Sequence, residues 1–184
     1  MSWEFETSTA AETQQLAHKL AGLLEAGDLI LLNGELGAGK TTFTQGLGRS
    51  LGVRPGIISP TFVLVRIHPN LADGPNPGGP DLVHVDAYRL ASPGEIDDID
   101  LENTMDTSVT VVEWGADRVE HLADSRLEID LLRATGAARG PQLDFEGEDD
   151  DEPRILRLRA IGPRWAGVDF SVLGTERPNT GGIG

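Results

Sequence analysis

The chain lacks cysteine and long apolar runs, and each absence excludes a class of protein. With no cysteine among its 184 residues, it can form neither disulfides nor thiolate metal sites. No stretch reaches the roughly 18 apolar residues that a membrane-spanning helix needs. Residues 1–6 have neither the basic segment nor the apolar segment that a secretory signal requires. We therefore expect a cytoplasmic protein.

Positive charge is also scarce. The chain has 15 Lys and Arg against 30 Asp and Glu, for a formal net charge of −15. The surplus lies mainly in residues 93–184, which hold 21 acidic and 9 basic side chains. Such a surface repels a phosphate backbone, so we expect no tight direct binding to nucleic acid. A basic protein partner or solubility alone would account for the surplus.

Lysine is the rarest charged residue, and one of the two lysines lies in a phosphate-binding motif. Besides Lys19 there is only Lys40, within the stretch GELGAGKT at residues 34–41. This stretch has the spacing G-x-x-x-x-G-K-[ST], in which glycines let backbone N–H groups surround phosphate oxygens. Lys40 would reach the β- and γ-phosphates and Thr41 would ligate Mg²⁺. The motif predicts binding of a nucleoside triphosphate with magnesium.

The residues around this motif have the order that such a loop requires. Residues 28–32 form an apolar run typical of a strand buried on both faces. After the loop, Phe43, Leu47 and Leu51 recur every four residues, and Gly52 can end a helix there. The sequence therefore predicts a strand, a phosphate loop and a helix in succession.

Further patterns predict the rest of the fold. We expect a helix that begins after Thr9, presents Leu16, Leu20, Leu23 and Leu24 on one face, and ends at Gly27. A short helix should begin at Ser92. Strand candidates are residues 3–6, 57–67, 82–88, 107–114, 126–133 and 154–160, of which the last two alternate polar and apolar residues as half-exposed antiparallel strands do. This order predicts a three-layer α/β P-loop NTPase fold whose mainly parallel central sheet is extended by antiparallel strands.

The chain should form one domain. We place it at residues 1–162, followed by a partly flexible C-terminal extension at 163–184. Two segments are predicted loop insertions: the proline- and glycine-rich residues 68–81, and residues 144–152, which carry seven acids in nine positions.

Two carboxylates are candidates for work at the phosphates. Glu113 directly follows a buried-strand pattern, so its side chain should emerge at the carboxyl edge of the sheet, where ligands bind in open α/β folds. Asp86 lies inside another apolar run, where a buried acid needs a partner or a metal. Either could instead be a structural acid. Ser59 and Thr61 could sense the γ-phosphate, although an ordinary turn is the favoured interpretation. We interpret His84 as a core histidine rather than a catalytic one.

Four ordered motifs together resemble the TsaE family, whose members are bacterial ATPases required for the N6-threonylcarbamoyladenosine modification of tRNA. The motifs lie at residues 34–43, 59–62, 84–90 and 113–114. The resemblance implies a P-loop ATPase that binds ATP and Mg²⁺ and works with a TsaB–TsaD heterodimer, in which TsaD transfers the threonylcarbamoyl group.

The resemblance also assigns residues. It implies that Lys40, Asp86 and Glu113 are the catalytic residues and that Thr41 and Glu113 hold Mg²⁺. Thr42 would lie against the α-phosphate and Trp114 beside the site. The residues expected to contact the nucleotide are Glu35, Gly37, Ala38, Gly39, Lys40, Thr41, Thr42 and Trp114. By its position, Arg154 resembles a C-terminal arginine of the family that lies near the nucleotide, although in this chain an insertion precedes it.

Two other functions fit the same loop. A small-molecule kinase would share the fold but should have an arginine-bearing lid, and residues 68–81 contain neither arginine nor lysine. A nucleotide-gated binding module would use ATP to order a docking surface, with incidental hydrolysis. Because no arginine finger is obvious within the motifs, we expect slow turnover by the isolated protein.

Overall fold

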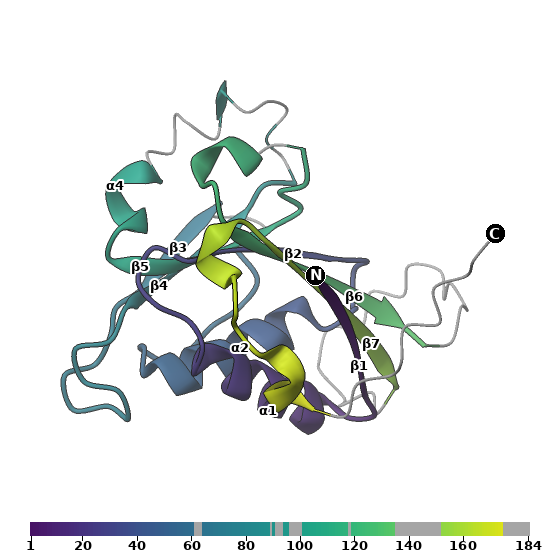
Figure 1. The fold of residues 1–184 in the computed structure, drawn as a ribbon. Helices are drawn as coiled ribbons and strands as arrows, with labels where there is room; N and C mark the ends of the chain where they lie inside the picture. The colour runs from purple at the N-terminus through teal and green to yellow at the C-terminus, as the bar shows by residue number, and fades with distance from the viewer. Residues whose placement is uncertain are drawn as a thin grey trace.

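A single seven-stranded sheet organises the molecule. The computed structural model describes residues 1–60, 64–88, 90, 94–95, 101–117, 119–134 and 152–174. In these residues the strand order is β1-β7-β6-β2-β5-β4-β3 (Figure 1). The strands are β1 (Ser2–Thr7), β2 (Leu29–Gly34), β3 (Val65–His68), β4 (Asp81–Asp86), β5 (Ser108–Glu113), β6 (Arg126–Arg133) and β7 (Arg154–Ile161). The helices are α1 (Ala10–Ala21), α2 (Lys40–Leu51) and α4 (Glu102–Met105), with 3₁₀ turns η1 (Glu120–Leu122), η2 (Pro163–Trp165) and η3 (Phe170–Leu173).

The sheet has a parallel centre and antiparallel edges, as the sequence predicts. Strands β6, β2, β5 and β4 are parallel neighbours. On one side β7 and β1 continue the sheet antiparallel, and on the other β3 does. One detail of the prediction was wrong: β6 is antiparallel only to β7 and pairs parallel with β2. Its alternating pattern reflects burial of one face, which does not fix strand direction.

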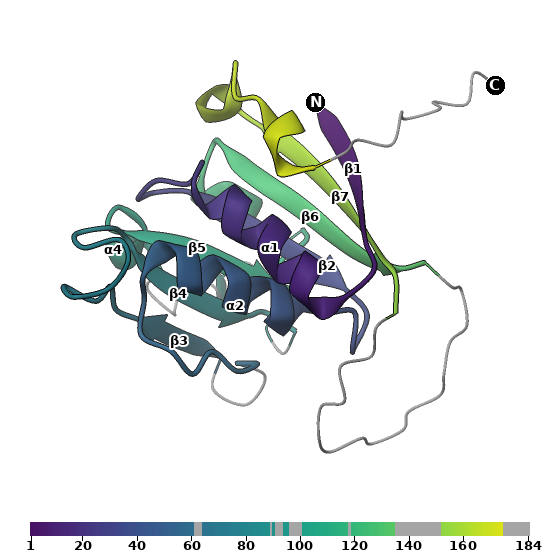
Figure 2. The same cartoon turned by 90° about the horizontal axis from the view of Figure 1, so that it is seen from below.

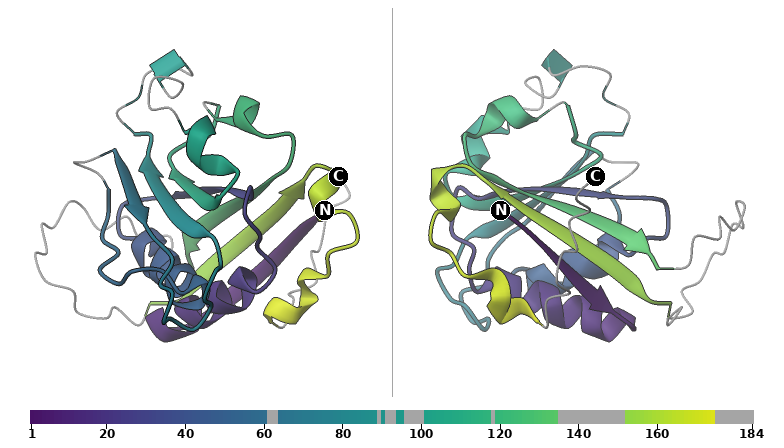
Figure 3. Two further views of the ribbon diagram at one scale, coloured as in Figure 1. Left: turned by 90° about the vertical axis from the view of Figure 1, so that its left-hand side faces the viewer. Right: turned by 45° about the vertical axis from the view of Figure 1, so that its right-hand side comes forward.

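Helices α1 and α2 lie side by side across one face of this twisted sheet (Figures 2 and 3). They approach closely at Gly46, where an added Cβ would lie 2.5 Å from the carbonyl oxygen of Gln14. The main hydrophobic cluster lies between this pair and the sheet. The opposite face packs a smaller cluster under α4 and the residues around η1, so the second outer layer is built from short elements in the described part of the chain. None of the helices there is long and apolar enough to cross a membrane.

Helix α1 begins where the sequence predicts and ends earlier. The Thr9 hydroxyl accepts a hydrogen bond from the backbone N–H of Glu12 at 3.1 Å, which caps the helix. The helix ends at Ala21 rather than at Gly27, because the chain must turn back to enter β2. Two 3₁₀-type bonds, from Leu23 and Leu24, continue the turn. Gly27 serves that turn with a φ of +96°.

The segment after β7 packs on the same core as the rest of the domain. Trp165, Phe170 and Leu173 are buried in the main cluster, and the Phe170 ring centroid lies 4.7 Å from that of Trp3. Arg164 binds the buried Asp28 carboxylate through two hydrogen bonds of 3.1 and 3.0 Å. Residues 163–173 of the expected extension therefore cover the end of α1 and the edge strand β1 (Figure 2). Residues 175–184 lie outside the described residues.

The predicted loop insertions have different outcomes. Residues 69–80 contain no helix or strand apart from one bridge between Asn70 and Val53, as expected. The Asn70 amide donates to the carbonyls of Leu51 and Asn76 at 2.8 and 2.9 Å, which fixes the loop under the end of α2. The acidic run at 144–152 lies outside the described residues except for Glu152.

Two other predicted segments can be compared only in part. Of the strand candidate at 57–67, only β3 forms, residues 57–60 are irregular, and residues 61–63 lie outside the described residues. Of the helix expected from Ser92, only residues 94 and 95 are described.

Candidate functional site

The turn between β2 and α2 forms the predicted phosphate loop. Gly37 and Gly39 have φ angles of +76° and +99°, a region that residues with a Cβ rarely adopt. Gly39 is the N-cap of α2 and supplies no side chain to bond the first N–H groups of the helix. Unpaired N–H groups at a helix start, together with the helix dipole, are suited to an anion.

Lys40 lies in the first turn of α2 with its ammonium directed back to the loop. Its Nζ donates to the carbonyl oxygens of Gly34 at 2.8 Å and Glu35 at 3.2 Å. Trp114 covers it, with Nζ 4.7 Å from the ring centroid. Burial lowers the pKa of this ammonium below its usual 10.5, and the carboxylates of Glu113 and Asp86 oppose that shift. Among the described residues the hydrogen bonds of Lys40 go only to these neutral carbonyl groups, so no carboxylate holds the ammonium by a direct hydrogen bond.

Asp86 and Glu113 end neighbouring parallel strands and are direct partners in the register of β4 and β5. Both are buried, at 3% and 2% exposure. Asp86 Oδ1 accepts from the backbone N–H of Tyr88 at 2.9 Å. Glu113 Oε1 lies 2.7 Å from Nε2 of the fully buried His84. The structure thus brings both predicted carboxylates to the carboxyl edge of the sheet, close enough to Lys40 to affect its pKa.

The remaining predicted residues border the same place. Thr41 and Thr42 follow Lys40 in the first turn of α2 and are half-buried. Trp114 has a φ of +59°, uncommon for a residue with a large side chain, and its ring meets that of Tyr88 edge-on at 5.6 Å. A hydroxyl at Thr41 and a carboxylate at Glu113 are oxygen donors, the ligands that Mg²⁺ prefers. This donor set fits magnesium bound beside a polyphosphate, and the assigned roles remain predictions.

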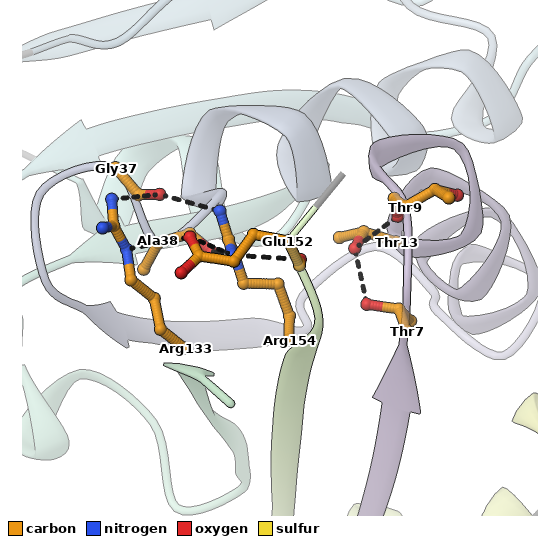
Figure 4. A network of polar contacts seen from close by, with 8 residues as sticks. All are labelled: Thr7, Thr9, Thr13, Gly37, Ala38, Arg133, Glu152 and Arg154. Atoms are coloured by element: carbon orange, nitrogen blue, oxygen red, sulfur yellow. Dashed lines mark hydrogen bonds and ion pairs between the residues drawn. The ribbon is translucent and has the colours of Figure 1, made fainter. Parts of the chain in front are cut away.

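Two arginines that the motifs do not contain also hold the loop (Figure 4). Arg154 Nε donates to the Ala38 carbonyl at 3.1 Å, and its Nη2 reaches the Gly37 carbonyl at 3.4 Å. Arg133 Nη2 donates to the same Gly37 oxygen at 3.3 Å. Glu152 lies between the guanidinium groups, 2.9 Å from Arg154 Nη1 and 3.8 Å from Arg133 Nε.

The resemblance placed Arg154 near the nucleotide, whereas sequence reasoning missed Arg133 altogether. The signal for Arg133 was its place at the end of a strand. In the register of β2 and β6, Gly34 pairs with Leu131, so a residue two positions further along β6 lies beside the phosphate loop. Of the possible switch residues, Ser59 is described and Thr61 lies outside the described residues.

Known proteins are similar to this chain in sequence and in fold. The family model for "Threonylcarbamoyl adenosine biosynthesis protein TsaE" matches residues 7–140. The tRNA threonylcarbamoyladenosine biosynthesis protein TsaE of Streptomyces coelicolor is 48% identical over 161 residues, covering 87% of this chain and 98% of that protein. The protein of the same name from Bacillus subtilis is 35% identical over 163 residues, covering 88% of each chain.

A solved structure agrees with these relatives. The crystal structure of Bacillus subtilis YdiB matches the fold with a TM-score of 0.65 and 28% identity, over 90% of each chain. The family model spans most of the chain, and the Streptomyces coelicolor protein is matched over nearly the whole of its own length. The chain therefore belongs to the TsaE family of tRNA threonylcarbamoyladenosine biosynthesis.

Proposed function

We propose that this chain is a Mg²⁺-dependent ATPase that acts in the cytoplasm with the TsaB–TsaD complex. Its task would be to support threonylcarbamoylation of adenosine 37 in tRNAs that read ANN codons. The observation that carries the ATPase proposal is the place of Lys40: a buried ammonium at the start of α2, bound only by neutral groups among the described residues and close to two carboxylates.

The residues of the site divide the work. The N–H groups of the loop and of the first turn of α2 would hold the phosphate oxygens, and Lys40 would neutralise charge that develops between the β- and γ-phosphates. Thr41 and Glu113 would hold Mg²⁺, which supplies further neutralisation there. Asp86, beside Glu113 and buried, would orient the attacking water.

The two arginines beside the phosphate loop support our expectation that the isolated protein turns over slowly. The described hydrogen bonds of Arg133 and Arg154 to the phosphate loop go to its carbonyl oxygens. Both guanidinium groups thus shape the loop, and neither serves there as a finger that stabilises the transition state. A partner that completes the site would raise the rate.

Apolar side chains at the rim of the loop support a protein partner. Leu36 is 90% exposed within the loop, and Tyr88, packed against Trp114, is 64% exposed. Exposed apolar side chains beside a functional site are candidates for contact with a partner. We propose that this rim contacts the TsaB–TsaD complex when ATP is bound.

The test combines hydrolysis with binding. ATP hydrolysis should rise when TsaB and TsaD are added, and ATP should increase their capture by the tagged protein. Lys40→Ala should abolish both effects. Lys19→Ala is the matched control, because Lys19 is exposed on α1 and donates a hydrogen bond to the Leu173 carbonyl, away from the loop.

Each alternative function has its own result in this test. Equal hydrolysis with and without the partners would refute the assembly part of the proposal. Transfer of phosphate from ATP to a nucleoside or small alcohol would favour a kinase. If Glu113→Ala stopped hydrolysis while modification continued over many turnovers, ATP would act as a gate.

A further inference from the structure

We propose that His84 is a positioning residue whose imidazole fixes the Glu113 carboxylate for its work at the nucleotide site. The inference rests on the proposed function, because it concerns the residue assigned to magnesium. It adds a residue that the sequence alone favours as a core histidine over a catalytic one.

The sheet places the two side chains on one face. In a strand, residues two positions apart point to the same side, so His84 and Asp86 share a face of β4. His84 pairs with Val111 and Asp86 pairs with Glu113, which makes His84 and Glu113 diagonal neighbours on adjacent strands. Leu82, on the same face of β4, packs in the main cluster beneath the helices.

The contact between them is short and buried. His84 Nε2 lies 2.7 Å from Glu113 Oε1, and the two residues are 0% and 2% exposed. A carboxylate that binds a cation can only accept hydrogen bonds, so the proposal assigns the ring proton to Nε2, which donates it to Glu113. A charge-assisted bond between buried groups is strong and directional.

The other ring nitrogen, Nδ1, gives a second argument for this role. Nδ1 is buried and has no hydrogen-bond partner among the described residues. Within the described part of the chain, the ring's one polar contact is therefore the hydrogen bond to Glu113. An apolar side chain would fill this place in the core without burying an unpaired nitrogen. The imidazole is best explained by the carboxylate that it holds.

Holding Glu113 in this way prepares it for a ligand. A glutamate side chain has three rotatable bonds, and a free carboxylate could turn in several ways toward Lys40 or Asp86. With Oε1 bound to His84, the second oxygen keeps one orientation at the carboxyl edge of the sheet. Loss of an outer partner of this kind typically weakens metal binding about 10–100-fold.

Two substitutions at one position separate the ring nitrogens. The side-chain nitrogen of glutamine is as many bonds from Cβ as Nε2 of histidine, so His84→Gln can still donate to Glu113. The asparagine amide matches the position of Nδ1 instead, so His84→Asn leaves the carboxylate without its donor. Both variants keep a neutral amide in the core and serve as controls for each other.

The readout is the gain in ATP affinity that Mg²⁺ produces, measured by calorimetry in EDTA and in Mg²⁺. His84→Asn should lose about 10–100-fold of this gain and keep its affinity in EDTA, whereas His84→Gln should keep the gain within about threefold. Glu113→Gln should lose the gain by itself, and adding His84→Asn to it should cause no further loss.

The outcomes separate this inference from the function on which it rests. A folded wild-type protein that binds no ATP would end the proposed function. Magnesium-enhanced binding that persists in His84→Asn, or losses that add in the double variant, would overturn the role of His84 alone. If His84→Asn does not fold, His84→Gln decides, and a loss of the gain there would refute the proposal.

Discussion

Replacing Arg154 tests whether the phosphate loop depends on a strand far from it in sequence. The Arg154 side chain is 11% exposed. Its guanidinium donates to the Gly37 and Ala38 carbonyls of the loop and to both the carbonyl and the carboxylate of Glu152. Arg154→Ala removes all these donors while β7 keeps its backbone pairing. We expect a less stable protein with a looser loop.

The size of the effect follows from what each acceptor does after the change. Gly37 is exposed, so its carbonyl can bond water instead, and losing the Arg154 bond there should cost little stability. Ala38 is 1% exposed, and an unpaired buried carbonyl costs about 1–3 kcal/mol. With the lost charge-assisted bond to Glu152, we expect a total of about 2–4 kcal/mol. At a urea dependence of about 2 kcal/mol per molar, the unfolding midpoint should fall by about 1–2 M.

A control on the same strand makes the measurement decisive. Arg157 also lies on β7 and pairs with Glu4 at 2.9 Å, but its side chain is 58% exposed. Exposed pairs contribute about 0–1 kcal/mol, so Arg157→Ala should hardly move the urea midpoint. ATP affinity should fall in Arg154→Ala and stay unchanged in Arg157→Ala. Equal midpoints for the two variants, or an unchanged ATP affinity in Arg154→Ala, would refute this account of the loop.

Three other residues give further predictions. Gly37→Ala would place a side chain at a φ of +76° with its Cβ 2.6 Å from Arg133 Nη2. Arg133 can move aside, but the backbone strain of about 1–2 kcal/mol remains. ATP binding, measured by calorimetry, should therefore weaken about 5–30-fold. Burial, reinforced by cationic neighbours, lowers the pKa of His68 below 6.5. The unfolded chain then takes up a proton before the native protein does, so stability should fall as pH drops through 6.5; urea unfolding at several pH values should show a shallower fall in His68→Gln. Phe170→Ala should destabilise the protein by about 3–5 kcal/mol in urea unfolding. Val172 is 54% exposed, so Val172→Ala should have almost no effect.

The sequence predicted best what is decided over short distances. The glycines of the loop, the apolar strand before it and the spacing of Phe43, Leu47 and Leu51 are all local, and each gave the correct element. The Thr9 cap was predicted for the same reason. The end of α1 was not, since it depends on where β2 must start in the sheet.

What the sequence could not predict depends on strand order. Arg133 reaches the loop only because β6 inserts next to β2. The contact between His84 and Glu113 likewise needs β4 beside β5 in a particular register. The packing of Phe170 was hidden because a 3₁₀ turn of four residues has no periodic apolar pattern long enough to recognise.

The charges gathered at the carboxyl edge give a physical reason for a metal in the proposed site. Lys40 offers one positive charge, and Asp86 and Glu113 bring two negative charges near it. A triphosphate bound at the loop would add several more negative charges beside the carboxylates. Like charges about 4 Å apart near a protein surface repel by about 4 kcal/mol, which one ammonium could not offset. A divalent cation held by Glu113 would turn that repulsion into attraction, so the acids that hinder binding of ATP alone would favour binding of ATP with Mg²⁺.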